Sequence, residues 1–129
     1  MQGAGLHMTN EQRTEQIIKK YGFNLINISK EEIIVLLQKD IADYQPGSSE
    51  YLRVRCGYLY CKGDISDVPR LEKAKYSINM DVCCMIDSEW IDSLKNGGIS
   101  SQYIRSRQEI IDDFVLYYKD FQAEEEGLE

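Results

Sequence analysis

The pattern of apolar and polar positions predicts a chain of short amphipathic helices. Apolar residues recur at steps of three and four along most of the sequence, which is the spacing of one face of an α-helix. The expected helices cover residues 10–21, 30–44, 49–62, 67–77, 80–96 and a last one that begins at 101 or 107 and ends near 122. The expected fold class is therefore all-α, an irregular bundle of about six short antiparallel helices.

Capping and turn residues mark the ends of these helices. Ser29 and Glu32 form a capping box that begins the second helix, and Pro46-Gly47 cannot continue it. Asn79 is a good N-cap for the fifth helix. Asn96-Gly97-Gly98 supplies the stop signal that ends it. Short helices joined by short connections are therefore expected in the middle of the chain.

The third predicted helix is apolar around most of its circumference. Only Arg53, Arg55 and Lys62 form a narrow polar strip on residues 49–62. A helix of this kind usually lies in the centre of a fold and is covered on two sides. Its opening residues also alternate as a β-strand would, but the apolar run Cys56–Cys61 breaks the alternation and favours the helix.

The spacing of the helices leaves two architectures open. The third and fourth helices, and then the fifth and sixth, can form two antiparallel pairs that begin about thirty residues apart, a spacing typical of helix-pair repeats. A small α-solenoid, HEAT-like in character, would follow from such repeats. The two pairs share no residue-level period, so an irregular bundle fits the sequence equally well.

The length of 129 residues predicts one domain, placed at residues 9–123. Residues 1–8 are interpreted as vector-derived or disordered, because His7-Met8 resembles a cloning junction before a native start. The acidic end, residues 124–129, is expected to be a disordered tail. The sequence has no apolar run of about 18 residues, so we expect neither a membrane span nor a membrane partner.

The charge of the chain points to a basic protein partner. Fifteen basic and twenty-two acidic residues give a net charge of -7 and a pI near 4.8. Binding to a nucleic-acid backbone depends on clustered lysine and arginine, which this balance argues against. An acidic surface instead suits a basic protein, although a moderately acidic surface is also common in proteins with no such role.

The four cysteines predict reduced, buried thiols. Cys56 and Cys61 are five residues apart, while Cys83 and Cys84 are neighbours, and neither spacing matches a zinc ligand pair. Free cysteine is stable in a reducing compartment, so a cytoplasmic location is expected. The sequence indicates no metal and no cofactor.

The side chains required for most enzyme mechanisms are missing from the sequence. The only histidine is His7, in the suspected junction, and no phosphate-binding glycine loop is present. We therefore predict that the chain is not an enzyme and has no catalytic residues. Asp87, at the edge of the apolar stripe of the fifth helix, would need a partner if it were partly buried. Lys75 is the expected partner, and the two would form a structural pin between helices.

The same region contains a candidate surface for a protein partner. Exposed tyrosine and tryptophan are strong interface anchors, and flanking carboxylates would attract a basic protein. The candidate residues are Asp64, Asp67, Glu72, Tyr76, Glu89, Trp90 and Asp92. The alternative for the aromatic residues is core packing, and the alternative for Asp64 and Asp67 is turn or cap chemistry.

Residues 51–98 resemble small helical bacterial immunity proteins of toxin–immunity systems. The resemblance is carried by the following positions: Leu52-Arg53, Cys56-Gly57-Tyr58-Leu59, Gly63-Asp64-Ile65, Ala74-Lys75, Asp81 and Ile86-Asp87. It implies a cytoplasmic protein that binds a toxin domain, often a nuclease, and blocks it. The alternatives are a helical adaptor that binds a peptide or helix and, third, a carboxylate-dependent enzyme.

Overall fold

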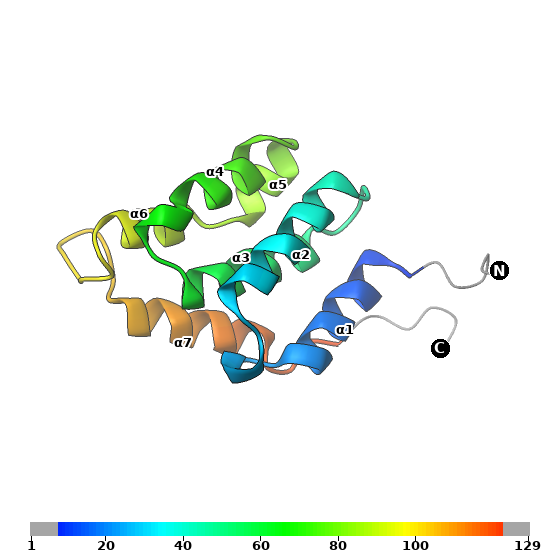
Figure 1. Ribbon diagram of the computed structural model, residues 1–129, viewed down its shortest axis with the longest axis horizontal. Helices are drawn as coiled ribbons and strands as arrows, with labels where there is room; N and C mark the ends of the chain where they lie inside the picture. The colour runs from blue at the N-terminus through cyan, green and yellow to red at the C-terminus, as the bar shows by residue number, and fades with distance from the viewer. Residues whose placement is uncertain (1–7, 123–129) are drawn as a thin grey trace.

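The computed structural model describes residues 8–122, which form α-helices and two short 3₁₀ helices (Figure 1). The helices are α1 (Asn10–Tyr21), η2 (Leu25–Asn27), α2 (Lys30–Ala42), α3 (Glu50–Lys62), η3 (Ile65–Asp67), α4 (Val68–Tyr76), α5 (Met80–Met85), α6 (Ser88–Lys95) and α7 (Arg107–Tyr118). No strand occurs in this range, and the all-α prediction is confirmed. The predictions for residues 1–7 and for the acidic tail lie outside the described residues.

The third helix is the centre of the fold, as its apolar circumference predicts. α3 lies between the α1–α2 pair, the group formed by α4, α5 and α6, and α7 (Figure 1). In a linear solenoid each repeat would contact only its neighbours, whereas α3 contacts helices from both ends of the chain. The arrangement is therefore an irregular bundle around one central helix.

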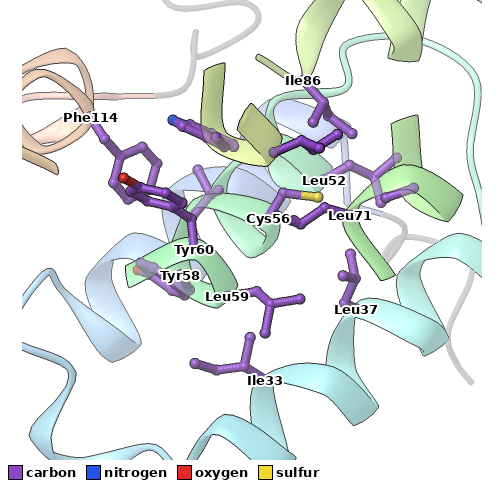
Figure 2. Packing of buried hydrophobic residues seen from close by; sticks show 14 of the residues in the cluster. Ile33, Leu37, Leu52, Cys56, Tyr58, Leu59, Tyr60, Leu71, Ile86 and Phe114 are labelled. Atoms are coloured by element: carbon purple, nitrogen blue, oxygen red, sulfur yellow. The ribbon is translucent and has the colours of Figure 1, made fainter. Parts of the chain in front are cut away.

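The core follows the length of α3. Figure 2 shows side chains of several helices meeting there: Ile33, Leu37, Leu52, Cys56, Tyr58, Leu59, Tyr60, Leu71, Ile86 and Phe114. Tyr58 and Phe114 make an edge-to-face contact with ring centroids 6.2 Å apart. A side chain at position 57 would overlap the Phe114 ring, so Gly57 allows α7 to approach α3 closely.

The polar strip of α3 is only partly exposed to solvent, and each of its cations has a partner on a neighbouring segment. Arg55 donates to Asp40 of α2 at 2.7 Å, and both side chains are nearly buried. Burial raises the pKa of Asp40, and the charge of Arg55 opposes that shift. Lys62 donates to two backbone carbonyls of the segment between α1 and α2. These contacts fasten α1 and α2 to the central helix.

The prediction of one continuous fifth helix over residues 80–96 is wrong. The chain leaves the helical conformation at Ile86 and Asp87, whose ψ angles are 120° and 126°, so that α5 and α6 are separate helices. Carbonyl groups freed by the break are bound by side chains from other helices. Arg53 donates to the carbonyl of Met85, and Lys75 donates to the carbonyls of Cys83 and Ile86.

The expected pairing of Lys75 with Asp87 is therefore wrong. Lys75 is buried and its ammonium group binds backbone carbonyls at the break. Asp87 is the N-cap residue of α6, and its carboxylate pairs with Arg53 at 3.0 Å. Both side chains hold the same break in place, but through different partners.

The last helix begins at the later of the two predicted positions. Ser106 and Glu109 form a capping box, in which the Ser106 hydroxyl accepts from the backbone N–H of Glu109. The helix ends at Tyr118, four residues before the predicted end. Its Arg107 donates to three carbonyls at the end of α3, those of Tyr60, Cys61 and Gly63, and so joins the two helices.

All four cysteines are free thiols, but they are not all buried as the sequence suggested. Cys56 is in the core, Cys61 and Cys83 are partly exposed, and Cys84 is exposed on the short helix α5. The spacing of the cysteines does not distinguish these environments, because the break after Met85 determines which side of α5 faces the core. Within residues 8–122, no helix is long and apolar enough to cross a membrane.

Candidate functional site

A groove of about 440 Å³ lies between α7 and the start of α6. Its walls come from α3, α6, α7, the α5–α6 break and the end of the loop before α7. The lining residues are Arg53, Asp87, Trp90, Arg105, Ile110, Asp113, Phe114, Leu116 and Tyr117. Apolar side chains on the floor and charged side chains at the rim give this groove the composition of a binding site.

Arg53 is held at one side of the groove by aromatic rings. Its guanidinium carbon lies 5.0 Å from the ring centroids of Trp90 and Tyr117, and 5.4 Å from that of Tyr118. These distances are within the range of a cation–π contact. The Arg53 side chain is 14% exposed and is paired with Asp87, whose side chain is 43% exposed. The carboxylate of Asp87 therefore keeps a face toward solvent.

Arg105 joins the two sides of the groove. It donates to both carboxylate oxygens of Glu89 on α6, at 2.9 and 2.7 Å, and also binds Asp113 on α7. The hydrogen bonds from Arg105 hold the pKa of Glu89 below its ordinary value. Glu89 is therefore ionised at neutral pH and is a poor proton donor. The pairing fits a role in binding and positioning better than one in acid catalysis.

The outer rim of the groove is formed by α7. Leu116 and Tyr117 are 62% and 60% exposed, although both are large apolar side chains. The neighbouring Tyr118 is buried, and its hydroxyl donates to Glu50 of α3. Buried Tyr118 thus fixes α7 against α3, while the two residues before it face outward. The rim offers apolar anchors beside carboxylates, a combination that suits recognition of a protein surface.

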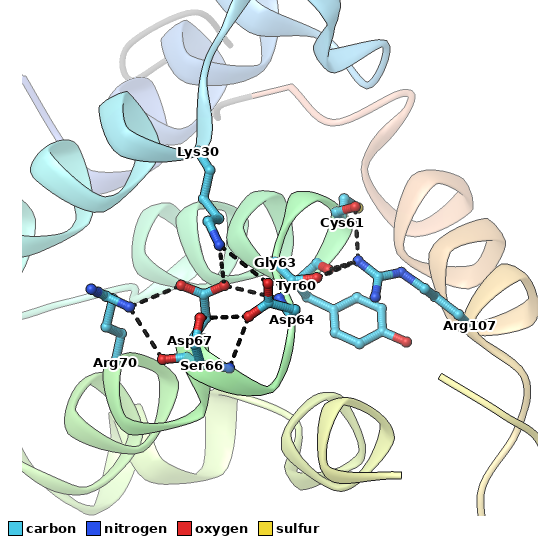
Figure 3. Close-up of polar contacts among 9 residues, drawn as sticks. All are labelled: Lys30, Tyr60, Cys61, Gly63, Asp64, Ser66, Asp67, Arg70 and Arg107. Atoms are coloured by element: carbon cyan, nitrogen blue, oxygen red, sulfur yellow. Dashed lines mark hydrogen bonds and ion pairs between the residues drawn. The ribbon is translucent and has the colours of Figure 1, made fainter. Parts of the chain in front are cut away.

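One residue of the predicted docking surface is a structural anion. Asp67 is fully buried, and its carboxylate accepts from Lys30 at 3.0 Å and from Arg70 at 2.9 Å (Figure 3). It also accepts from the backbone N–H of Asp64. A partner cannot reach this group, so the prediction that Asp67 binds a partner is wrong. A buried carboxylate needs such compensation, and here it fastens α2 to the start of α4.

Trp90 is the second predicted docking residue that is buried, so the prediction that it binds a partner on the surface is wrong. It is 1% exposed, it stacks on Tyr60 with centroids 6.2 Å apart, and it meets Phe114 edge to face. The core-packing alternative therefore applies. Trp90 also lines the floor of the groove, so a side chain bound in the groove could contact it there.

The other predicted docking residues have varied surroundings. Asp64 is exposed, caps η3 by accepting from Ser66, and lies 3.6 Å from Lys30. Glu72 lies 3.6 Å from Lys95 and so joins α4 to α6. Tyr76 is 63% exposed at the end of α4, and Asp92 is exposed on α6. Of the predicted set, only Trp90 lines the groove, and Glu89 touches it through Arg105.

Comparisons of this chain with protein-family models, with curated proteins and with solved structures found no match.

Several residues of the groove were missed by the sequence reasoning. Leu116 lies off the helical stripe of Ile110 and Phe114, which indicates an exposed apolar residue. Tyr117 is seven residues after Ile110 and three after Phe114, on the stripe itself, so its exposure at the rim could not be predicted from the spacing. Nothing local in the sequence links Arg105 to Glu89, sixteen positions earlier.

Among the described residues, no group of three potential metal ligands occurs.

Proposed function

We propose that this chain is an immunity protein that binds a cognate bacterial toxin domain and neutralises it by masking its active cleft. A basic nuclease is the expected class of toxin. The observation that carries the proposal is the groove of about 440 Å³ beside α7, which combines exposed apolar side chains with carboxylates. A stoichiometric inhibitor requires a surface of this kind and no catalytic group of its own.

The charge of the chain supports a basic partner. The net charge is -7, and the groove region includes the carboxylates of Asp87 and Asp113, which are paired with Arg53 and Arg105 but keep 43% and 58% of their side chains exposed. Complementary charge speeds the encounter of two proteins and selects against wrong partners. Apolar contacts with Leu116 and Tyr117 would then slow dissociation. The resemblance of residues 51–98 to immunity proteins points in the same direction.

The cytoplasm is the proposed site of action. All four cysteines are free, and Cys84 is exposed on the surface of α5, where an oxidising compartment would modify it. A protein that protects its own cell against a toxin would act in the same compartment as an intracellular target such as nucleic acid.

The proposal is tested by expressing a candidate toxin domain from a gene neighbouring this one, with and without the chain. The expected result is that the toxin domain alone stops growth, that co-expression of the chain restores it, and that the two proteins purify as a one-to-one complex. A toxin domain from an unrelated pair serves as the specificity control and should remain toxic. Unrestored growth together with separate purification of the two proteins would exclude the immunity function.

A helical adaptor is the second candidate, and the shape of the groove favours it. A site of about 440 Å³ with an apolar rim can accept a side chain or one turn of a peptide helix from any partner. An adaptor would bind such a segment without protecting cells from the neighbouring toxin. The growth assay therefore separates the two functions.

A further inference from the structure

The outward face of α7 is a continuous stripe beside the groove. Glu109, Asp112, Asp113, Leu116 and Tyr117 of α7 are exposed, and so is Asp120 in the turn after the helix. Steps of three and four residues place the helical members on one side of the helix. The opposite side is buried through Ile110, Phe114 and Tyr118. This helix therefore packs with one face and presents the other to solvent.

The stripe has a defined chemical pattern. Leu116 and Tyr117, 62% and 60% exposed, form an apolar centre. Asp112 and Asp113 precede this centre by one helical turn, and Asp120 follows it in the turn just after the end of α7. The nearby cations are Lys119, Arg53 and Arg105; Arg53 is already bound to Asp87, and Arg105 is already bound to Glu89 and Asp113. The free charge of the stripe is thus negative on both sides of its apolar centre.

We propose that the α7 stripe and the groove beside it form a docking surface for a cationic amphipathic segment of the partner protein. Apolar side chains of the segment contact Leu116 and Tyr117, while its lysine or arginine side chains lie beside Asp112 and Asp120. A cation entering the groove meets the solvent-facing side of Asp87. The identity of the partner in this inference rests on the proposed function, whereas the chemistry of the surface does not.

Charge selects this occupant over a second copy of the chain. Two copies would each carry a net charge of -7 and would bring like-charged stripes together. Like charges opposed across an interface cost binding free energy. A cationic segment instead gains from the same charges, and its apolar face covers side chains that this chain leaves exposed.

The surface is tested with a model peptide and the isotope-labelled protein in an NMR titration. The probe is a cationic amphipathic peptide of leucine and lysine, about 18 residues or five helical turns long. A peptide with glutamate in place of lysine is its matched control. The expected result is that the cationic peptide shifts backbone signals of α7 and of the groove, while the acidic peptide shifts none. Shifts confined to the surface around Tyr76 and Asp92, equal binding of both peptides, or no binding would overturn the proposal.

Variants locate the binding face more sharply. Leu116→Ala is expected to weaken binding of the cationic peptide about tenfold, as loss of an apolar anchor does. Val35→Ala on α2 is its control, because Val35 is 61% exposed far along the chain from α7. Asp112→Lys should also weaken binding, whereas Asp43→Lys changes the net charge equally and should not. Equal effects within either pair would show that the α7 stripe is not the binding face.

The toxin domain distinguishes failure of this inference from failure of the proposed function. If the toxin domain binds and is neutralised but Leu116→Ala and Asp112→Lys leave its affinity unchanged, the α7 stripe is not the docking surface and the immunity function stands. If the cationic peptide binds α7 and the toxin domain does not bind the chain at all, the docking surface stands and the immunity function fails.

Discussion

Arg53 of α3 and Asp87 at the α5–α6 break form an ion pair of 3.0 Å that joins the central helix to the groove. The same arginine donates to the carbonyl of Met85 and lies against three aromatic rings. One side chain thus binds the broken end of α5, supports the start of α6 and contacts α7. The groove keeps its shape because these three elements meet at Arg53.

Asp87→Ala should destabilise the fold. The substitution leaves the Arg53 guanidinium, whose side chain is 14% exposed, without its carboxylate. Because Asp87 itself is 43% exposed, the loss is expected to be about 1 kcal/mol in the free energy of unfolding. Chemical denaturation measures it. Asp92→Ala, at an exposed position of α6, is the control and should change stability by less than about 0.5 kcal/mol. Equal changes would mean that the ion pair contributes nothing.

Gly57→Ala should also destabilise the protein, although alanine is the better helix former by about 1 kcal/mol. The added methyl group overlaps the Phe114 ring, and such overpacking costs about 1–3 kcal/mol. Combining it with Phe114→Leu, which opens space, should reduce the cost of the alanine. A double-mutant cycle by thermal melting measures this coupling. A stabilising Gly57→Ala would show that α3 and α7 are not in close contact there.

The pKa of Glu89 should lie below its ordinary value of 4.5, because Arg105 donates two hydrogen bonds to its carboxylate. A carboxyl group whose pKa is lowered in the folded state stabilises the fold at pH values above its ordinary pKa. This contribution to stability is lost as the pH falls through the folded pKa. In Arg105→Gln the pKa should return toward 4.5. NMR titration of the side-chain carboxyl groups measures it.

Asp40 is the internal control for that titration. Burial raises its pKa from the usual 3.8, which is the opposite direction. Stability from Asp40 is therefore greatest below about pH 3.8 and decreases as pH rises through its folded pKa. Arg105→Gln should leave the pKa of Asp40 unchanged. A Glu89 pKa that is the same in both proteins would contradict the contact with Arg105.

The four thiols should react with an alkylating reagent in a fixed order. Cys84 is exposed and should be modified first, followed by Cys83. Burial raises the pKa of Cys61 to about 11, so this partly exposed thiol should react more slowly than Cys83 and Cys84. Cys56 is fully buried and its pKa is also raised, so it should react only in denaturant. Mass spectrometry of the labelled peptides gives the order, and early labelling of Cys56 would contradict the placement of α3 in the core.

The helical fold could be predicted from local signals. Ser29 and Asn79 mark helix starts that the structure contains, and the apolar circumference of α3 indicates its central position. The break at Asp87 could not be predicted in this way, because Val82, Ile86, Trp90 and Leu94 continue one helical stripe. Their spacing shows which residues are buried but not that the backbone changes direction between them.

The candidate site was less predictable than the helices, because local spacing does not show how whole helices pack against each other. Charged partners such as Arg53 with Asp87, or Lys30 with Asp67, come from positions more than thirty residues apart and depend on the packing of whole helices. Composition could show an acidic chain with many aromatic residues. It could not show that Trp90 is buried while Tyr117 is exposed, since both belong to amphipathic helices and differ only in which face they occupy.

The most direct test of the proposed function is the association rate constant between this chain and a candidate toxin domain from a neighbouring gene, measured at two salt concentrations. We predict a one-to-one complex whose association slows at least about tenfold between about 50 and 300 mM salt, because opposite charges steer the encounter. Its dissociation rate should change little. Absence of a complex, or association that does not respond to salt, would contradict the proposed function.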